Sequence, residues 1–187
     1  MILYGITCGG PRLVVRIVAA LDAGLDIVVV REPTLPPLGL LLPYGDRVVL
    51  HARMPGAVEA ALRHGFGLHL PDGGTLPPGV RPRRLGRSTH SVTDARRALA
   101  EGADYAVLSP IWPPGSKPDD TRPTLGPAVF AEVAAVALGG VTPERAREAI
   151  AAGAAGVAAM GAIFGGDDPA AAVRAFRAAQ KLQTSSS

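Results

Sequence analysis

The sequence predicts an α/β protein, a (β/α)8 TIM barrel that is shortened and has its second helix reduced or missing. Eight short apolar runs alternate with Ala-rich helical segments or with turns along the chain. Glycines end several of the helical segments, and a glycine-containing turn follows each of the last two runs, where such barrels bind phosphate. The alternative, an open doubly wound sheet, would usually show fewer strands and no phosphate signals after the last two.

The expected strands are apolar runs bounded by turn residues. The clearest, residues 26–30, is a nearly continuous β-branched run, as in a strand buried on both faces of a parallel sheet. We expect strands at residues 1–6, 26–30, 47–50, 66–70, 84–86, 104–108, 134–138 and 156–159.

The expected helices have apolar residues at helical spacing, and Pro143 stands at the first turn of one of them. After Arg31 the chain has so many prolines that a full helix is disfavoured, which gives the missing second helix. Turn residues dominate 71–79, and a long polar loop spans 110–125. We expect helices at residues 12–23, 55–64, 93–101, 126–132, 143–152 and 169–182.

Length and composition indicate one barrel domain at residues 1–182, followed by a disordered tail at 183–187. The chain has 187 residues, 48% of them hydrophobic, which suffices for a core. No run approaches the roughly 18 apolar residues of a membrane span, and the start lacks the pattern of a secretion signal. The single cysteine fits a reducing compartment. We therefore expect a cytoplasmic protein with no membrane partner.

The charge pattern indicates a small anionic ligand. The net charge is +3, and the basic residues, almost all arginine, are scattered along the chain. Outside residues 81–87 they show no aromatic interleaving, so a phosphorylated small molecule fits better than a nucleic acid. The apolar surface of the Ala-rich helices leaves a homo-oligomer open.

Two turns are candidate phosphate-binding loops. Gly139 and Gly140 follow the seventh expected strand, and Gly161 and Ala162 follow the eighth. Glycine lets the backbone approach an anion, and the start of a helix directs N–H groups and a partial positive charge toward it. Either turn alone would also suit an ordinary loop, but their positions one βα unit apart favour a phosphate site.

Four further motifs lie in the same order along the chain: Leu-Gly-Arg-Ser-Thr-His-Ser at 85–91, Ala-Asp-Tyr at 103–105, Ser-Pro-Ile-Trp-Pro at 109–113 and Gly-Gly-Val-Thr-Pro-Glu at 139–144. With these motifs the chain resembles the thiamine phosphate synthase/TenI family, closely from about residue 85 to 168 and more weakly before. The resemblance implies an enzyme of thiamine biosynthesis, a barrel that binds a phosphorylated thiazole as its small-molecule partner. The synthase branch joins this thiazole to a pyrimidine pyrophosphate with Mg²⁺, whereas the TenI branch tautomerises the thiazole carboxylate phosphate without a metal.

The synthase motifs are reduced in this sequence. The second strand end keeps Arg31 and Glu32, but the third reads His51-Ala52-Arg53 and lacks the metal-binding carboxylate of the synthase pattern. The fourth leaves one carboxylate, Asp72. We therefore expect the TenI branch, a thiazole tautomerase (an isomerase) with no metal and no cofactor. The alternatives are a divergent thiamine phosphate synthase that uses Mg²⁺, and a non-catalytic regulatory protein that binds a thiazole or thiamine phosphate.

The candidate catalytic residue is His51, because it ends a strand at the barrel mouth and histidine is the usual base near neutral pH. The TenI pattern places its histidine at the end of the sixth strand, where Pro110 cannot transfer a proton. A locally hydrogen-bonded role for His51 fits the sequence equally well. The expected substrate-binding residues are Arg31, Ser88, Ser116 and Lys117, each with a local alternative such as an ion pair, a helix cap or a solvated surface position.

Overall fold

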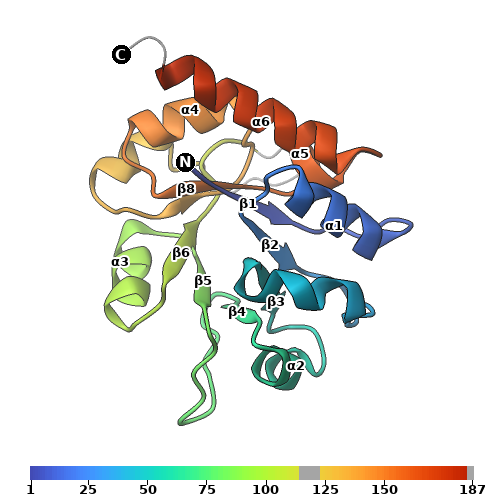
Figure 1. Cartoon of the computed structure of the whole chain (residues 1–187). Coiled ribbons are helices and arrows are strands. Elements are labelled where there is room, and N and C mark those ends of the chain that lie inside the picture. The colour runs from blue at the N-terminus through green and yellow to red at the C-terminus, as the bar shows by residue number, and fades with distance from the viewer. Residues whose placement is uncertain (114–122, 185–187) are drawn as a thin grey trace.

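The computed structural model describes residues 1–113 and 123–184, with the last three described by their backbone alone. Within these residues eight parallel strands pair in sequence order and close into a barrel through β1 and β8, with Leu3 opposite Val157 (Figure 1). The predicted barrel is thus confirmed, and an open sheet is excluded. The strands are β1 Ile2–Ile6, β2 Ile27–Val30, β3 Val48–His51, β4 Gly67–Leu70, β5 Leu85–Thr89, β6 Tyr105–Leu108, β7 Val136–Ala137 and β8 Gly156–Ala159.

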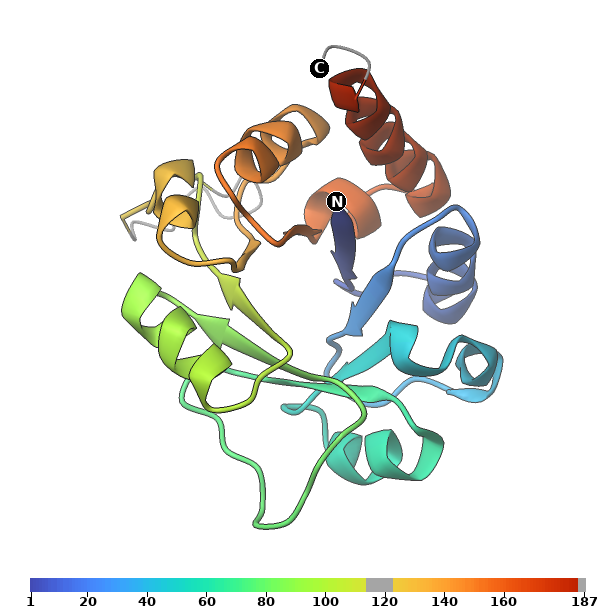
Figure 2. The ribbon, with the colours of Figure 1, turned by 60° about the vertical axis from the view of Figure 1, so that its left-hand side comes forward.

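The helices surround the strands (Figure 2). They are α1 Leu13–Asp22, α2 Ala57–His64, α3 Val92–Ala100, α4 Pro143–Ala151, α5 Gly161–Phe164 and α6 Pro169–Thr184. The short α5 is not expected from the sequence, because four residues carry no helical periodicity. Helix α6 continues to Thr184, two residues into the expected tail, and residues 185–187 lie outside the described residues.

Three crossovers lack an α-helix among the residues that the structure describes. Between β2 and β3 the chain forms the 3-10 segment η1, Gly39–Arg47, with Pro43 inside it, which confirms the reduced second helix. Between β4 and β5 it forms an irregular loop that extends away from the barrel (Figures 1 and 2). A second 3-10 segment, η2 Pro127–Ala131, stands where a short helix is expected before β7. The chain therefore closes an eight-stranded barrel with fewer residues than are usual for the fold.

Alternation along each strand divides the apolar side chains between two cores. One set packs between the barrel and its helices and includes Leu3, Val28 and Leu50. The other fills the barrel interior. Its members are Tyr4, Ile6, Ile27, Val29, Val49, Tyr105, Val107, Val136 and Ala158.

Two large aromatic rings pack against each other in the barrel interior. The rings of Tyr4 and Tyr105 lie 4.9 Å apart, and both residues are buried. Glycines on neighbouring strands make room for them: a Cβ on Gly86 would lie 2.1 Å from the Tyr105 ring, and one on Gly156 would lie 3.3 Å from that of Tyr4. Burial raises the pKa of Tyr4 to about 12 and that of Tyr105 well above 10, so both hydroxyls keep their protons.

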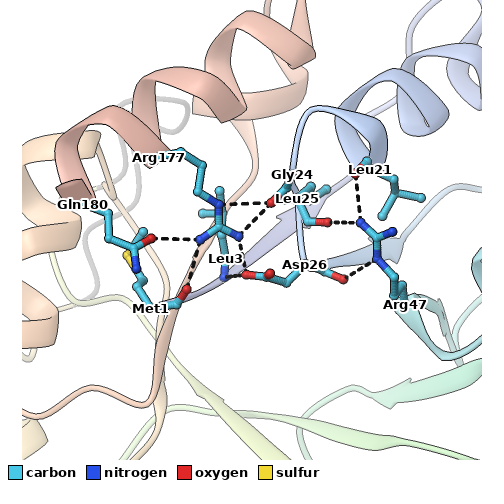
Figure 3. Close-up of polar contacts among 9 residues, drawn as sticks. All are labelled: Met1, Leu3, Leu21, Gly24, Leu25, Asp26, Arg47, Arg177 and Gln180. Atoms are coloured by element: carbon cyan, nitrogen blue, oxygen red, sulfur yellow. Dashed lines mark hydrogen bonds and ion pairs between the residues drawn. The ribbon is translucent and has the colours of Figure 1, made fainter.

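A polar network holds the amino-terminal end of the barrel (Figure 3). Arg177 on α6 donates to the Asp26 carboxylate at 2.5 Å and to the carbonyls of Gly24 and Met1. The same carboxylate accepts the N–H of Leu3, while Arg47 donates to the carbonyl of Asp26. The network ties the last helix to the first two strands, so it stabilises barrel closure.

In the part of the chain that the structure describes, no helix is both long enough and apolar enough to cross a membrane.

Candidate active site

A pocket of about 660 Å³ opens at the carboxyl ends of the strands. Its floor follows from strand alternation, because each residue two positions beyond an interior side chain also faces the barrel axis. Val29 leads in this way to Arg31, Val49 to His51, and Tyr105 to Val107. All eight strands or the turns that follow them contribute to the lining, so the pocket sits where (β/α)8 barrels carry their active sites.

Arg31 and Arg53 bring positive charge to this pocket without a counter-charge. The Arg31 backbone N–H donates to Thr7 Oγ1 at 2.9 Å, and its Nη1 lies 3.8 Å from the sulfur of Met160. Among the residues that the structure describes, neither guanidinium forms an ion pair, and both side chains are exposed. The ion pair of Arg31 with Glu32, considered from the sequence, does not form. The two guanidiniums are therefore available to an anionic ligand.

The turn after β7 is shaped by its two glycines. Gly139 and Gly140 have φ angles of +97° and +63°, which side chains rarely adopt, and a Cβ on Gly140 would lie 2.6 Å from the carbonyl oxygen of Pro113. Thr142 caps α4 by accepting the N–H of Arg145, whose Nη1 donates to the Gly140 carbonyl at 2.8 Å. Arg145 thus adds a third guanidinium to the pocket wall.

The turn after β8 meets the same pocket. Gly161 and Ala162 line it and begin α5. The first amides of a helix have no acceptor within that helix, so the N–H groups of these two lining residues are potential donors. The predicted phosphate-binding residues of the two turns are thereby brought together, and phosphate binding by them stays a prediction.

Two histidines stand side by side on the pocket floor, with ring centroids 5.5 Å apart. Burial lowers the pKa of His51 to about 4, helped by the nearby charges of Arg31 and Arg53. Burial likewise lowers the pKa of His69 to about 3, with contributions from His51 and Arg31. Both rings are neutral at physiological pH. His51 Nδ1 accepts the backbone N–H of Arg53 at 3.2 Å, so its ring proton lies on Nε2.

Ser88 lines the pocket and lies 2.9 Å from His69 Nε2, while His69 Nδ1 lies 3.1 Å from the Tyr105 hydroxyl. The next residue, Thr89, instead donates to the buried carbonyl of Val107. Ser91 caps α3, so the helix-cap role considered from the sequence for Ser88 does not form. Ser88 therefore lines the pocket without capping a helix, and substrate binding by it stays a prediction.

Among the described residues of the pocket wall, Asp72 carries the only carboxylate. Glu32 accepts the backbone N–H of Gly9 at 3.0 Å and does not line the pocket. The described residues include no group of three or more side chains able to hold a metal ion. Since Mg²⁺ is commonly held by one or two carboxylates together with substrate phosphates, this donor set fits only an ion that arrives on a phosphorylated substrate, and Asp72 is the carboxylate that would hold it.

The structure brings most of the predicted site residues together in the pocket and leaves two untested. Those that line it are Arg31, His51, Ser88, Gly139, Gly140, Gly161 and Ala162. Ser116 and Lys117 lie outside the described residues. The sequence analysis assigns no role to Arg53, Arg145 or His69, which also line the pocket. The period-two alternation identifies His69, whereas the arginines lie beyond regular strands and carry no such signal.

The fold and the pocket define a (β/α)8 barrel with an anion-accepting pocket at its carboxyl end. A family profile described as thiamine monophosphate synthase matches residues 47–163. A thiamine-phosphate synthase of Methanoculleus marisnigri is 36% identical over 184 residues, covering 87% of this chain and 84% of the relative. One of Haloquadratum walsbyi is 33% identical over 185 residues, covering 83% and 78%. The chain therefore belongs to the thiamine monophosphate synthase family.

A solved structure supports the same fold. The thiamine phosphate pyrophosphorylase of Bacteroides thetaiotaomicron aligns with a TM-score of 0.72 at 21% identity, covering 98% of each chain. At this identity the match speaks for the barrel alone.

The tautomerase prediction is wrong. Relatives at 36% to 40% identity are named thiamine-phosphate synthase, and nothing in the comparisons places the chain in the TenI branch or supports an isomerase. A lost carboxylate at the third strand end does not by itself exclude a synthase. At this strand end the pocket is lined by Arg53 and His51 in place of that acid, so polar side chains remain at the site.

Proposed function

We propose that the protein is a thiamine-phosphate synthase, a transferase that joins a thiazole phosphate to a pyrimidine pyrophosphate. In this reaction a carbon–nitrogen bond forms between the pyrimidine methylene carbon and the thiazole nitrogen. The carbon–oxygen bond to the diphosphate breaks, and pyrophosphate leaves with the bonding electron pair. The reaction consumes no oxidant, and both substrates must fit one pocket together.

The observation that carries the proposal is the 36% identity over 184 residues to a relative named as this synthase. The pocket chemistry supports it independently. A leaving pyrophosphate needs positive charge, and Arg31 and Arg53 offer it without having to break an ion pair among the described residues. The glycine turns after β7 and β8 suit the phosphate of the thiazole.

The donor set fits Mg²⁺ bound to the diphosphate, with Asp72 as the carboxylate that would hold it. When bound, the ion would neutralise charge on the leaving pyrophosphate. Arg31 and Arg53 share this task, and their fixed positive charge would compensate for the shortage of carboxylates. We expect activity to depend on Mg²⁺ while part of the charge neutralisation comes from the two arginines.

His51 fits a donor role better than the role of a base predicted from the sequence. Formation of the carbon–nitrogen bond transfers no proton from the thiazole, so no base is needed. The pKa of about 4 keeps the ring neutral, and its proton lies on Nε2 because Nδ1 accepts the Arg53 N–H. We propose that His51 donates a hydrogen bond from Nε2 to a substrate acceptor.

The test is turnover of the purified protein with thiazole phosphate, pyrimidine pyrophosphate and Mg²⁺, followed as thiamine phosphate. We expect product only when both substrates are present. Binding of both substrates without product would contradict the proposal and support the non-catalytic alternative. The Arg31→Ala variant serves as the inactive control, and a variant at the amino-terminal end, Arg177→Ala, serves as a control for stability.

A further inference from the structure

Three polar side chains form a chain of hydrogen bonds from the barrel interior to the pocket. Tyr105 OH lies 3.1 Å from His69 Nδ1, and His69 Nε2 lies 2.9 Å from Ser88 Oγ. Tyr105 and His69 are buried, with exposed fractions of 5% and 3%, whereas Ser88 reaches the pocket. A neutral imidazole has one donor and one acceptor nitrogen, so the chain of bonds has two directions open to it.

The buried tyrosine decides between these directions. Its hydroxyl keeps its proton, and within the described residues His69 Nδ1 is its one hydrogen-bond partner. If Nδ1 carried the ring proton, the Tyr105 O–H would have no acceptor, which is costly in a buried place. Tyr105 therefore donates to Nδ1, and the His69 proton lies on Nε2 and is donated to Ser88. One of the two Ser88 lone pairs then accepts the His69 N–H, and the Ser88 O–H, which has no other partner among the described residues, is available as a donor.

The backbone of β5 is adapted to this arrangement. A Cβ on Gly86 would lie 2.4 Å from the Tyr105 hydroxyl and 2.6 Å from His69 Nδ1. Any side chain at this strand position would separate the two groups. Gly86 has no left-handed φ to explain it, so the close approach of Tyr105 and His69 accounts for the glycine.

We propose that Tyr105 and His69 are positioning residues that fix Ser88 as a hydrogen-bond donor to an acceptor group of the bound substrate. The assignment gives the floor of the pocket two directed donors, Ser88 Oγ and His51 Nε2, and so selects for substrate groups that accept hydrogen bonds there. A substrate analogue with a donor at that position would have to use the second lone pair of Ser88 and would lose the hydrogen bond donated by its O–H. The inference deepens the proposed function and rests on it only for the identity of the substrate.

The direction of the hydrogen bonds from Tyr105 through His69 to Ser88, called the relay below, can be measured without an activity assay. In protein labelled with ¹⁵N in its histidines, long-range ¹⁵N–¹H correlation distinguishes the protonated from the unprotonated ring nitrogen. We expect His69 to carry its proton on Nε2 at pH 7 and to remain neutral down to pH 5. In Tyr105→Phe we expect this preference to weaken. A proton on Nδ1 in the wild-type protein would overturn the proposal.

The second experiment is a double-mutant cycle that measures kcat/KM of the complete synthase reaction. His69→Leu and Ser88→Ala should each lower kcat/KM about tenfold, as for loss of one directed hydrogen bond, and the double variant should lose no more than either. His69→Gln keeps an N–H donor to Ser88 and should stay within about threefold of the wild type. If the two single losses in kcat/KM multiply in the double variant, His69 does not act through Ser88 and the proposal is overturned.

Thr89→Val is the matched control, because Thr89 neighbours Ser88 on β5 and its hydroxyl donates to the Val107 carbonyl away from the pocket. It should lower thermal stability and leave kcat/KM unchanged. If the wild-type protein shows no synthase activity, the proposed function fails, whereas the His69 tautomer still tests the relay. If the wild type is active and the tautomer is reversed, the relay alone fails.

Discussion

The two ends of the barrel use arginine in opposite ways. At the amino-terminal end, Arg177 and Arg47 donate to several carbonyl oxygens, and Arg177 also pairs with Asp26 (Figure 3). At the carboxyl end, Arg31 and Arg53 line the pocket, and within the described residues neither pairs with a carboxylate. An arginine whose donors are satisfied by the protein stabilises the fold, whereas one left without a counter-charge is available to a ligand. Substitutions at the two ends should therefore separate stability from activity.

The largest effect is expected from Arg31→Ala. Removing this guanidinium takes positive charge from the site of the leaving pyrophosphate, so kcat/KM for the pyrimidine substrate should fall more than hundredfold. The unfolding midpoint should stay within about 2 °C of the wild type, because Arg31 forms no ion pair among the described residues. Steady-state kinetics and thermal melts measure both. A loss of less than threefold would remove Arg31 from the site.

Arg177→Ala should produce the converse result. The variant loses donors to Asp26, Gly24 and Met1, and Arg177 is only 23% exposed, so the free energy of unfolding should fall by about 2 to 3 kcal/mol. Activity at 25 °C should be unchanged. Arg174→Ala is the control on the same helix, because its pairing with Asp168 at 3.8 Å is largely exposed and should contribute less than about 0.5 kcal/mol. If urea unfolding shows equal losses in the free energy of unfolding for the two variants, the stabilising role assigned to Arg177 is refuted.

The pocket histidines should make stability depend on pH. Both have pKa values below 6.5 in the folded state, so the unfolded chain binds more protons at mildly acidic pH. Stability from this source is complete above about pH 6.5 and is lost as the pH falls toward 4. The difference in free energy of unfolding between pH 7 and pH 4.5 should shrink by about 2 kcal/mol in His51→Gln. An unchanged difference in urea titrations would show that His51 titrates normally.

The smallest effect is expected at Asp72. Because it is the only carboxylate in the described pocket wall, Asp72→Asn should raise the Mg²⁺ concentration for half-maximal rate by about three- to tenfold. The rate at saturating Mg²⁺ should change little, since Arg31 and Arg53 retain their charge. Metal titration of the initial rate provides the measurement. An unaltered Mg²⁺ dependence would exclude Asp72 as a ligand.

The strands were predictable because each is a short apolar run between turns, and the structure places all eight within a few residues of the expected bounds. The largest deviation is at β7, which is reduced to Val136–Ala137 although residues 134–138 are apolar. The hydrophobic pattern gives burial but not the hydrogen bonds that define a strand. Helix α5 was missed for a related reason, since its four residues form a single turn fixed by tertiary contacts.

The site was predictable in part. Strand order and the glycine turns indicate which strand ends meet, so His51, Arg31 and Ser88 were expected at the mouth, and all three line the pocket. The Tyr105–His69–Ser88 relay depends on distances across three strands and on the gap left by Gly86, which sequence spacing does not encode. The choice of reaction failed because the absence of one motif carboxylate does not reveal the guanidinium groups beside it.

The stoichiometry of the two products tests the central claim most directly. With purified protein, both substrates and Mg²⁺, thiamine phosphate and pyrophosphate should accumulate in a one-to-one ratio, and the Arg31→Ala variant should lose both together. Pyrophosphate released without thiamine phosphate, or the absence of both products from folded wild-type protein, would contradict the assignment of this pocket as a synthase site.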